Sequence, residues 1–234
     1  MRKVVIRLVV ALVVLAVVLV AADRIAVAYA QREVAQRLQT SYDLSNRPSV
    51  KVEGFPFLTQ VAMGHYDDIR VHTGGLTARG VPIEELHVRL LGVEAPLREL
   101  LSNQRSAMRA ASAEATAVVP LAQIRERVPE GITLDAQGKM LRLSGQASLL
   151  GRSVPVSVMA NVSVDEGDVL VTATRVSMNG NPVDGAVGER LEERYSFTIS
   201  LGDLPAGLRP TGVAVTTEGL RITATARDVL LTPA

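Results

Sequence analysis

The sequence predicts an α+β protein in which a hydrophobic N-terminal helix and an amphipathic helix precede a series of antiparallel strands. Three observations lead to this prediction. Fifteen consecutive apolar residues run from Leu8 to Ala22. A period of 3.6 follows in residues 27–42, and beyond Pro48 the apolar residues change to a period of 2, which is typical of half-buried strands.

The apolar run is flanked by charges in the order of an export signal. Three basic residues precede it, and Asp23 and Arg24 close it. Both a signal peptide and an inside-positive membrane anchor have this order, so either interpretation exports the chain. As a helix, Val4 to Ala22 reaches about 28 Å, close to the thickness of the hydrocarbon layer. We therefore expect residues 1–28 to be a signal-anchor or signal peptide, with retention favoured. Cleavage near residue 28 or 30 stays open, because Ala26-Val27-Ala28 and Ala28-Tyr29-Ala30 offer the small residues that signal peptidase needs.

The rest of the chain, residues 29–234, is expected to form a single domain, because no Pro-, Ser- or Gly-rich linker divides it. The absence of Cys excludes disulfide bonds and thiolate metal sites. Residues 1–30 hold four of the 25 basic and one of the 24 acidic residues, so 21 basic and 23 acidic residues are left, a net charge of −2. This balance argues against nucleic acid as a partner and against purely electrostatic attachment to anionic lipid.

The predicted elements follow the two periods in chain order. The amphipathic helix places Val27, Ala30, Val34, Leu38 and Ser41/Tyr42 on one face. Strands are expected at 49–53, 68–73, 83–91 and 111–119, with short helices at 96–101 and 121–128. Four further strands, at 132–136, 140–149, 154–164 and 169–178, are separated by Gly-containing turns, which predicts consecutive antiparallel hairpins. A helix at 183–194 and strands at 195–201, 212–217 and 220–230 complete the chain.

The apolar residues of these strands are mainly aliphatic, since the chain has no Trp, three Phe and four Tyr. A sheet with such a lining either packs as an ordinary core or curls around a space that apolar ligand chains occupy. Composition alone favours the ordinary core.

The most specific segment, residues 52–71, contains two of the three Phe. Pro56 fixes its own φ and biases Phe55 toward an extended conformation, so Phe55 and Phe57 are predicted to lie in a stiff apolar segment. Such a segment is either an apolar wedge at a bilayer or lipid pocket, or a corner of the core. Residue types alone favour the corner of the core.

Two runs in this segment, Gly54-Phe-Pro-Phe-Leu-Thr-Gln60 and Gly64-His-Tyr-Asp67, resemble the signature of the actinobacterial LmeA-like family. The resemblance covers nearly the whole exported chain, and His65 stands where a basic residue commonly follows the glycine. It implies an exported phospholipid-binding protein of lipomannan and lipoarabinomannan maturation. It also implies a fold related to tubular lipid-binding domains, in which a curved antiparallel sheet wraps a long amphipathic helix.

With this resemblance, the sequence predicts a non-enzymatic protein of the cell envelope, membrane-anchored or soluble in the periplasm. It would sequester or present phospholipid, with an inositol phospholipid or a lipid-linked glycan precursor as candidates. The residues expected to contact lipid are Val34 and Leu38 on the helix, Phe55, Phe57, Leu58 and Met63 at the mouth, and Met140, Leu149, Val158 and Val176 on the strands. The expected headgroup contacts are Arg70, His72 and Arg98.

No catalytic residues, cofactor or metal site are predicted. The local signatures of serine hydrolases, phosphate-binding loops and dinucleotide-binding folds do not occur in the sequence. His65, Asp67 and His72 would form a metal cluster only if a turn brought them together. The alternative to a lipid-binding protein is a membrane-anchored structural or interaction module that supports an envelope glycosyltransferase without binding lipid.

Overall fold

The structure is a computed structural model, and it describes residues 2–42, 44–78, 81–95, 108–126, 128, 130–149, 152–201 and 204–231. Side chains are described within these ranges except at 75–78, 81–82, 147–149, 152 and 205. The helices are α1 (Arg2–Ser41), α2 (Phe57–Met63), α4 (Leu121–Arg125), α5 (Gly185–Tyr195) and the short 3-10 helix η1 (Pro205–Gly207). The strands are β1 (Ser49–Glu53), β2 (His65–Ala78), β3 (Val81–Glu94), β4 (Met108–Pro120), β5 (Thr133–Gln137), β6 (Met140–Leu149), β7 (Arg152–Asp165), β8 (Asp168–Met178), β9 (Asn181–Pro182), β10 (Phe197–Ile199), β11 (Arg209–Val215) and β12 (Gly219–Leu231).

The strands form two antiparallel sheets, so the predicted α+β class is confirmed. One sheet has the order β1-β2-β3-β4-β12-β11, and the other has the order β10-β8-β7-β6-β5 with β9 paired to β8. Strands β5 to β8 are neighbours in chain order and pair as the predicted consecutive hairpins. Most strands are longer than the sequence periodicity indicates. For example, β2 begins at His65 rather than Asp68.

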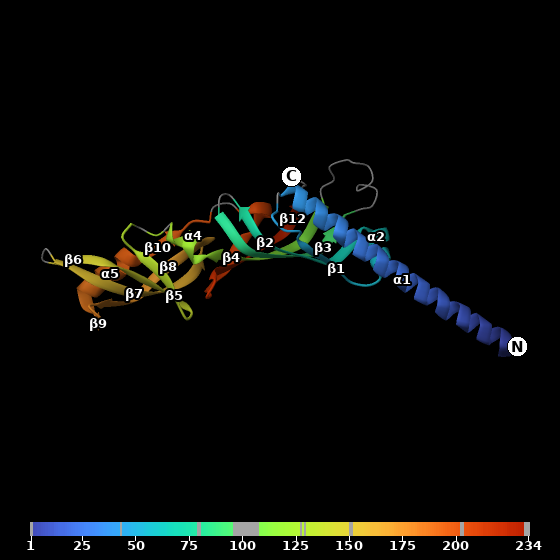
Figure 1. The fold of residues 1–234 in the computed structure, drawn as a ribbon, viewed down its shortest axis with the longest axis horizontal. Coiled ribbons are helices and arrows are strands. Elements are labelled where there is room, and N and C mark those ends of the chain that lie inside the picture. Colours follow the sequence, from blue (N-terminus) through green and yellow to red (C-terminus); the bar gives the residue numbers. More distant parts are fainter. Residues whose placement is uncertain are drawn as a thin grey trace. The chain divides into compact units, whose positions relative to one another are not determined.

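The two predicted N-terminal helices are one continuous helix, α1, because neither Gly nor Pro occurs between Arg2 and Ser41. Its C-terminal part packs against β1 and α2, and Figure 1 shows this part of α1 beside both. The buried residues of α1 are Asp23, Val27 and Ala35. The prediction of the buried face is thus right for Val27, whereas Val34 is exposed. The curvature of a sheet around this helix stays a prediction.

Helix α2 replaces part of the stiff segment that the sequence predicts after Phe55. The φ of Pro56 is −76°, the value that its ring was predicted to fix, and Pro56 is the residue before the helix rather than the middle of a stiff apolar run. The extended conformation of Phe55 stays a prediction. Gly64 ends the helix in the left-handed conformation, with φ 67°, and its N–H donates to the carbonyl of Val61 at 3.2 Å. The segment between β1 and β2 is therefore a two-turn helix with defined ends.

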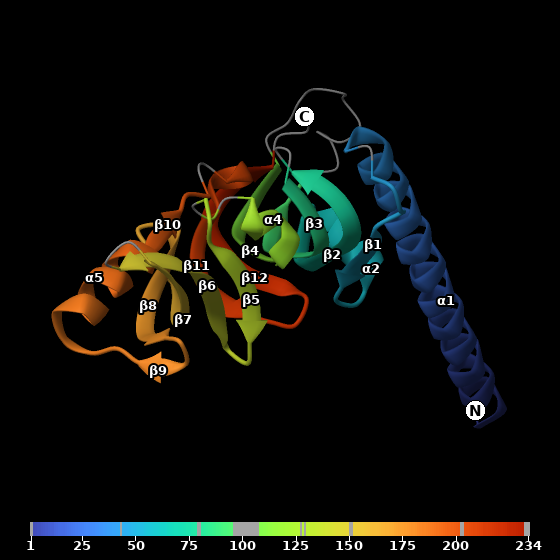
Figure 2. The same cartoon turned by 60° about the vertical axis from the view of Figure 1, so that its left-hand side comes forward.

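The sheet β10-β8-β7-β6-β5 carries a closed aliphatic core. Leu141 and Leu143 of β6 lie opposite Ala160 and Val158 of β7, and all four side chains are completely buried. Leu191 and Tyr195 of α5 belong to the same core, together with apolar residues of α4, β11 and β12. Figure 2 shows α5 beside β8 of this sheet.

The predicted helices of the second half differ from the structure mainly at their ends. The helix expected at 183–194 begins at Gly185 and ends at Tyr195. The helix expected at 121–128 ends already at Arg125. The helix expected at 96–101 lies outside the described residues.

The chain divides into two compact units. Residues 1–73, 88–113 and 227–234 form one, and residues 74–87 and 114–226 form the other. The first unit contains α1, β1 and α2, and the second contains the closed core around β5 to β8. That residues 29–234 behave as one domain stays a prediction.

Candidate lipid-contact site

The run from Leu8 to Ala22 in α1 is apolar on every face. All Val, Leu and Ile side chains from Val4 to Val20 are 45–67% exposed, so none of them is covered by another part of the described chain. By length and composition α1 is able to cross a membrane, and a signal sequence near the N-terminus has the same properties. The structure is therefore consistent with the predicted signal or anchor.

Asp23 connects the end of the apolar run to α2. It is 2% exposed, and its Oδ1 accepts the backbone N–H of Leu58 at 2.8 Å, while its Oδ2 accepts Nη2 of Arg24 at 2.6 Å. The Arg24 guanidinium in turn lies 5.1 Å from the ring centre of Phe55, a cation–π distance. The first turn of α2 is thus held at the residue that directly follows the apolar run of α1.

Helix α2 presents an apolar surface to solvent. Phe57 is buried and its ring centre lies 6.4 Å from that of Tyr66, whereas Phe55 is 61% exposed, Leu58 44% and Met63 74%. We call Phe55, Leu58 and Met63 the α2 patch. Leu58 and Met63 are five positions apart in α2 and so lie on different sides of the helix, which means that the α2 patch is a set of exposed side chains along one short segment rather than one face. Several large apolar side chains exposed in one short segment are typical of a contact with a partner or a membrane.

The polar residues of the motif around α2 have structural roles. Nε2 of Gln60 donates to the carbonyl of Glu53 at 3.1 Å, and Oε1 of Gln60 accepts the N–H of Asp67 at 3.2 Å. Gln60 therefore joins the end of β1 to the start of β2. Gly54 has φ 99°, and a Cβ on it would lie 2.5 Å from Nε2 of Gln60. These contacts explain why glycine and glutamine stand at the two ends of the Gly54–Gln60 run.

A charged cluster lies on β2 and β3 of the same unit. The carboxylate of Asp68, which is 8% exposed, accepts Nη2 of Arg70 at 2.8 Å and Nη2 of Arg89 at 2.9 Å. The hydrogen bonds from Arg70 hold the pKa of Asp68 below its ordinary value, against the opposing effect of burial, and Arg89 adds to them. The same contacts raise the pKa of Arg70.

The predicted lipid-contact residues fall into three groups. Phe55, Leu58 and Met63 form the α2 patch, whereas Phe57 is buried. Val34 and Leu38 lie on α1, about 16 Å or more beyond Asp23 along the helix, so they are not part of this patch. Val158 and Val176 belong to the closed core of the second unit, Met140 is half-buried on β6, and the side chain of Leu149 lies outside the described residues.

The predicted headgroup residues are also separated by their contacts. Arg70 is bound to Asp68, and its Nη1 also lies 3.7 Å from Oε1 of Glu53. His72 lies near Glu85 and His87 of β3. Arg98 lies outside the described residues. These three assignments stay predictions.

The cluster of His65, Asp67 and His72 does not form in the described hairpin. Nε2 of His65 lies 3.8 Å from Oδ1 of Asp67. However, β2 continues without a turn from His65 to His72, which places these two histidines about 23 Å apart along the strand.

A model of the LmeA-like phospholipid-binding family matches residues 21–225. The chain belongs to this family. The family match begins two residues before Asp23, so it includes the contact between Asp23 and α2 as well as both sheets. No curated protein and no solved structure matched the chain.

Membership of the LmeA-like family indicates that the chain binds phospholipid. The description of the family refers to binding and not to an enzymatic activity. Together with the apolar α1 helix, it indicates that lipid or a membrane is the partner of this chain.

Three features of the site escaped prediction from the sequence. Asp23 was interpreted only as the end of the apolar run, although an acidic residue inside a continuing helix is a signal that it has a partner. Gln60 and the ion pairs of Asp68 depend on contacts between strands, for which the sequence carries no local pattern. The sequence marks Gln60 only indirectly, by its place between Gly54, six residues before it, and Gly64, four residues after it.

Proposed function

We propose that this chain is an exported, membrane-anchored and non-enzymatic phospholipid-binding protein that contacts its lipid through the α2 patch. Membership of the LmeA-like family supports the ligand class. The exposed side chains of Phe55, Leu58 and Met63 support the location. The lipid would be held without a covalent step, by contact of its acyl chains with apolar side chains.

The observation that carries this proposal is the hydrogen bond from the Leu58 N–H to Asp23. In a retained anchor, the apolar run ends at Ala22, where α1 leaves the hydrocarbon layer. Asp23 follows directly, so α2 is attached to the helix at the depth of the lipid headgroups. Amphipathic segments at this depth insert apolar side chains between lipids, and Phe and Leu are typical of them.

The patch and the anchor have different tasks in this proposal. Each buried CH₂ group contributes about 0.8 kcal/mol, so α1, with its full apolar span, supplies the attachment to the membrane. The α2 patch has only three apolar side chains, which is enough to contact one or two acyl chains. Its contribution is to hold a lipid next to the protein surface rather than to hold the protein in the membrane.

The finer role is presentation or sequestration of the lipid during lipoglycan and envelope biogenesis, with an inositol phospholipid or a lipid-linked glycan precursor as candidate ligands. Arg70 and His72 are the proposed headgroup contacts among the described residues. The side chain of Arg70 is about half exposed while it is bound to Asp68, so its guanidinium is able to donate a further hydrogen bond to a phosphate oxygen.

A second candidate function is a membrane-anchored structural module that binds no lipid and supports an envelope enzyme such as a glycosyltransferase. The closed core favours it. Val158, which was expected to line a lipid cavity, has no exposed surface, and Val176 is 4% exposed. Side chains packed to this extent leave no space for an acyl chain beside them.

Single cysteines distinguish the two functions, because the natural chain has no Cys. We would introduce Leu58→Cys or Met63→Cys in the full chain, attach an environment-sensitive fluorophore and reconstitute the protein in phospholipid nanodiscs. The matched control is Val187→Cys, which replaces an exposed apolar residue of α5. Phospholipids that carry a quencher at different depths of the acyl chain then report contact.

We expect strong quenching at positions 58 and 63 by quenchers in the upper part of the acyl chain, and weak quenching at position 187. Equal, weak quenching at all three positions would contradict contact through the α2 patch. Mass spectrometry of the purified full chain provides the second measurement. Recovery of bound phospholipid supports a lipid-binding protein, and its absence together with weak quenching supports the structural module.

A further inference from the structure

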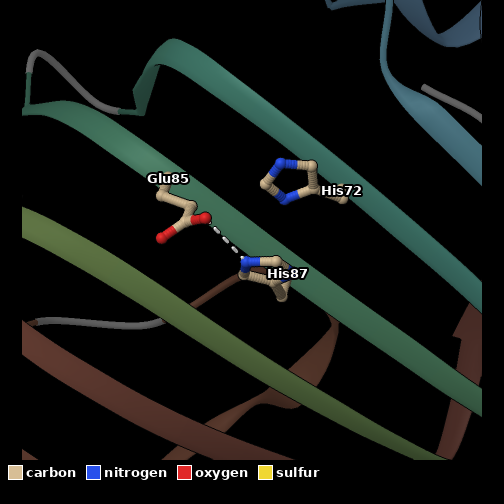
Figure 3. A group of neighbouring side chains, drawn as sticks. All are labelled: His72, Glu85 and His87. Atoms are coloured by element: carbon tan, nitrogen blue, oxygen red, sulfur yellow. Dashed lines mark hydrogen bonds and ion pairs between the residues drawn. The ribbon is translucent and has the colours of Figure 1, made fainter.

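Two histidines and a glutamate gather on the paired strands β2 and β3. Figure 3 shows His72 on one strand and Glu85 and His87 on its neighbour, with the three side chains near one another. One ligand atom from each residue lies within 4.8 Å of the other two, and Nε2 of His87 lies 3.0 Å from Oε1 of Glu85. The family match assigns no role to this group, and of the three residues only His72 is among the proposed headgroup contacts.

The arrangement follows from strand geometry. Residues 85 and 87 are two positions apart on β3, so their side chains lie on the same face of the sheet. His72 is six residues before the end of β2 at Ala78, and His87 is six residues after the start of β3 at Val81. Cross-strand partners have Cβ atoms about 5 Å apart, close enough for two imidazoles to share one ion.

The donor set fits a borderline transition metal. Zn²⁺ binds imidazole nitrogen and carboxylate oxygen at about 2.0–2.2 Å, so two ligand atoms of a tetrahedral site lie about 3.3 Å apart. The ligand atoms of His72, Glu85 and His87 lie within 4.8 Å of one another, so each pair is at most about 1.5 Å farther apart than this spacing. Two histidines and one carboxylate leave a fourth position for water, as in open zinc sites.

The surroundings tolerate a cation. The nearest described cations on the same two strands are Arg70 and Arg89, and both donate to the carboxylate of Asp68. Arg70 also lies near Glu53. The carboxylates of this neighbouring cluster offset the charges of its arginines, and His72 and His87 are themselves exposed to solvent, so an ion reaches them without an opening of the fold.

We propose that His72, Glu85 and His87 form a Zn²⁺-binding site on the surface of the β2–β3 pair. The site goes beyond phospholipid binding. His72, which is also a proposed headgroup contact, would serve here as a metal ligand, whereas Glu85 and His87 have no part in the proposed lipid contact. The open fourth position is able to take water or another oxygen ligand. A hard cation such as Mg²⁺ is not expected to bind, because imidazole is a poor ligand for it.

The test is a calorimetric titration of Zn²⁺ into the untagged full chain in detergent, after removal of metals with a chelator. We expect one saturable site per chain. His72→Ala and His87→Ala should each weaken binding by at least about tenfold, since even the loss of a supporting residue around a metal commonly costs that much. Glu85→Gln keeps the shape of the side chain but removes its charge, and should also weaken binding.

The matched control is His65→Ala, which removes an exposed histidine of the same strand that has Asp67 beside it. Its affinity for Zn²⁺ should stay within about twofold of the unmodified chain. Co²⁺ in place of Zn²⁺ gives visible absorption that depends on the ligands, and this absorption should be lost in His72→Ala and His87→Ala but not in His65→Ala. Circular dichroism checks that each variant is folded.

Two results would overturn the site. One is the absence of saturable Zn²⁺ binding by the folded full chain. The other is an affinity that is the same in His72→Ala, His87→Ala and His65→Ala, which would assign the binding to residues elsewhere in the chain.

Discussion

Asp68 makes the folded state sensitive to acid. The Arg70 guanidinium, with Arg89, holds the pKa of this carboxyl below its ordinary value of 3.8. The ionised form is therefore favoured by folding, and its contribution to stability is fully present above the pKa of the unfolded chain. As the pH falls through the lower pKa of the folded state, that contribution is lost.

We expect Asp68→Asn to destabilise the chain by about 1–3 kcal/mol at pH 7, because it removes the charge that two guanidiniums face. The difference between Asp68→Asn and the unmodified chain should begin to shrink below about pH 4, where the Asp68 carboxyl of the unfolded chain becomes protonated while that of the folded chain is still ionised. Chemical denaturation between pH 7 and pH 3 measures it. Asp67→Asn, which changes a neighbouring exposed carboxylate, is the control. A difference that does not depend on pH would contradict the role of the charge.

Gly54 is required both by its backbone conformation and by its closeness to Gln60. Gly167, in the turn between β7 and β8, has a similar φ of 93° but no atom within 4 Å of a Cβ added to it. Gly167→Ala should therefore cost only the strain of the left-handed conformation, about 1–2 kcal/mol. Gly54→Ala should cost at least about 1 kcal/mol more, because its Cβ also displaces Gln60.

Thermal unfolding of the two glycine variants compares these costs directly. Hydrogen exchange should in addition show faster exchange at the start of β2 in Gly54→Ala, because the N–H of Asp67 donates to Gln60. Equal stability of the two variants would mean that the side chain of Gln60 moves aside without loss.

Helix α2 begins with a buried aromatic residue, Phe57, whereas Phe55, two residues before it, is exposed. Phe57→Ser should destabilise the chain by about 3–5 kcal/mol or more, as expected for the loss of a buried Phe. Phe55→Ser should cost less than about 1 kcal/mol, the value of its cation–π contact with Arg24. Among folded molecules, Phe55→Ser should lower lipid uptake more than Phe57→Ser does.

Denaturation together with uptake of a fluorescent phospholipid measures both effects. Phe55→Ser is expected to stay folded and to take up less lipid than the unmodified chain. If Phe55→Ser takes up lipid normally while it is folded, Phe55 is not part of the lipid contact. The pair thus separates a role in the core from a role at the surface for two aromatic residues that are two positions apart.

The elements that the sequence predicts best are the ones with long, regular periods. Strands β6 to β8 match their predicted ranges within a few residues, because each has many alternating positions and a glycine turn beside it. Helix α2 was missed for the opposite reason. Its seven residues span only two turns, so they show no period, and Pro56 favours an extended interpretation of the whole segment.

The fold class and the family could be predicted from the sequence, whereas the pairing of distant strands could not. The neighbouring positions of β4 and β12 depend on contacts across about a hundred residues, for which no local pattern exists. The proximity of His72 and His87 is an intermediate case. His72 lies six residues before Ala78 and His87 six residues after Val81, but the predicted strands end at residue 73 and begin at residue 83, and these bounds do not place the two histidines opposite each other.

The hydrogen bond between Asp23 and Leu58 also links proteolytic processing to the shape of the mature protein. Both small-residue cleavage sites lie C-terminal to Asp23 and Arg24, so a cut at either one would discard the acceptor of the Leu58 N–H and the cation beside Phe55. A released form would have to rebuild the first turn of α2 without them. Cleavage by signal peptidase would thus change the conformation of the domain as well as release it from the membrane.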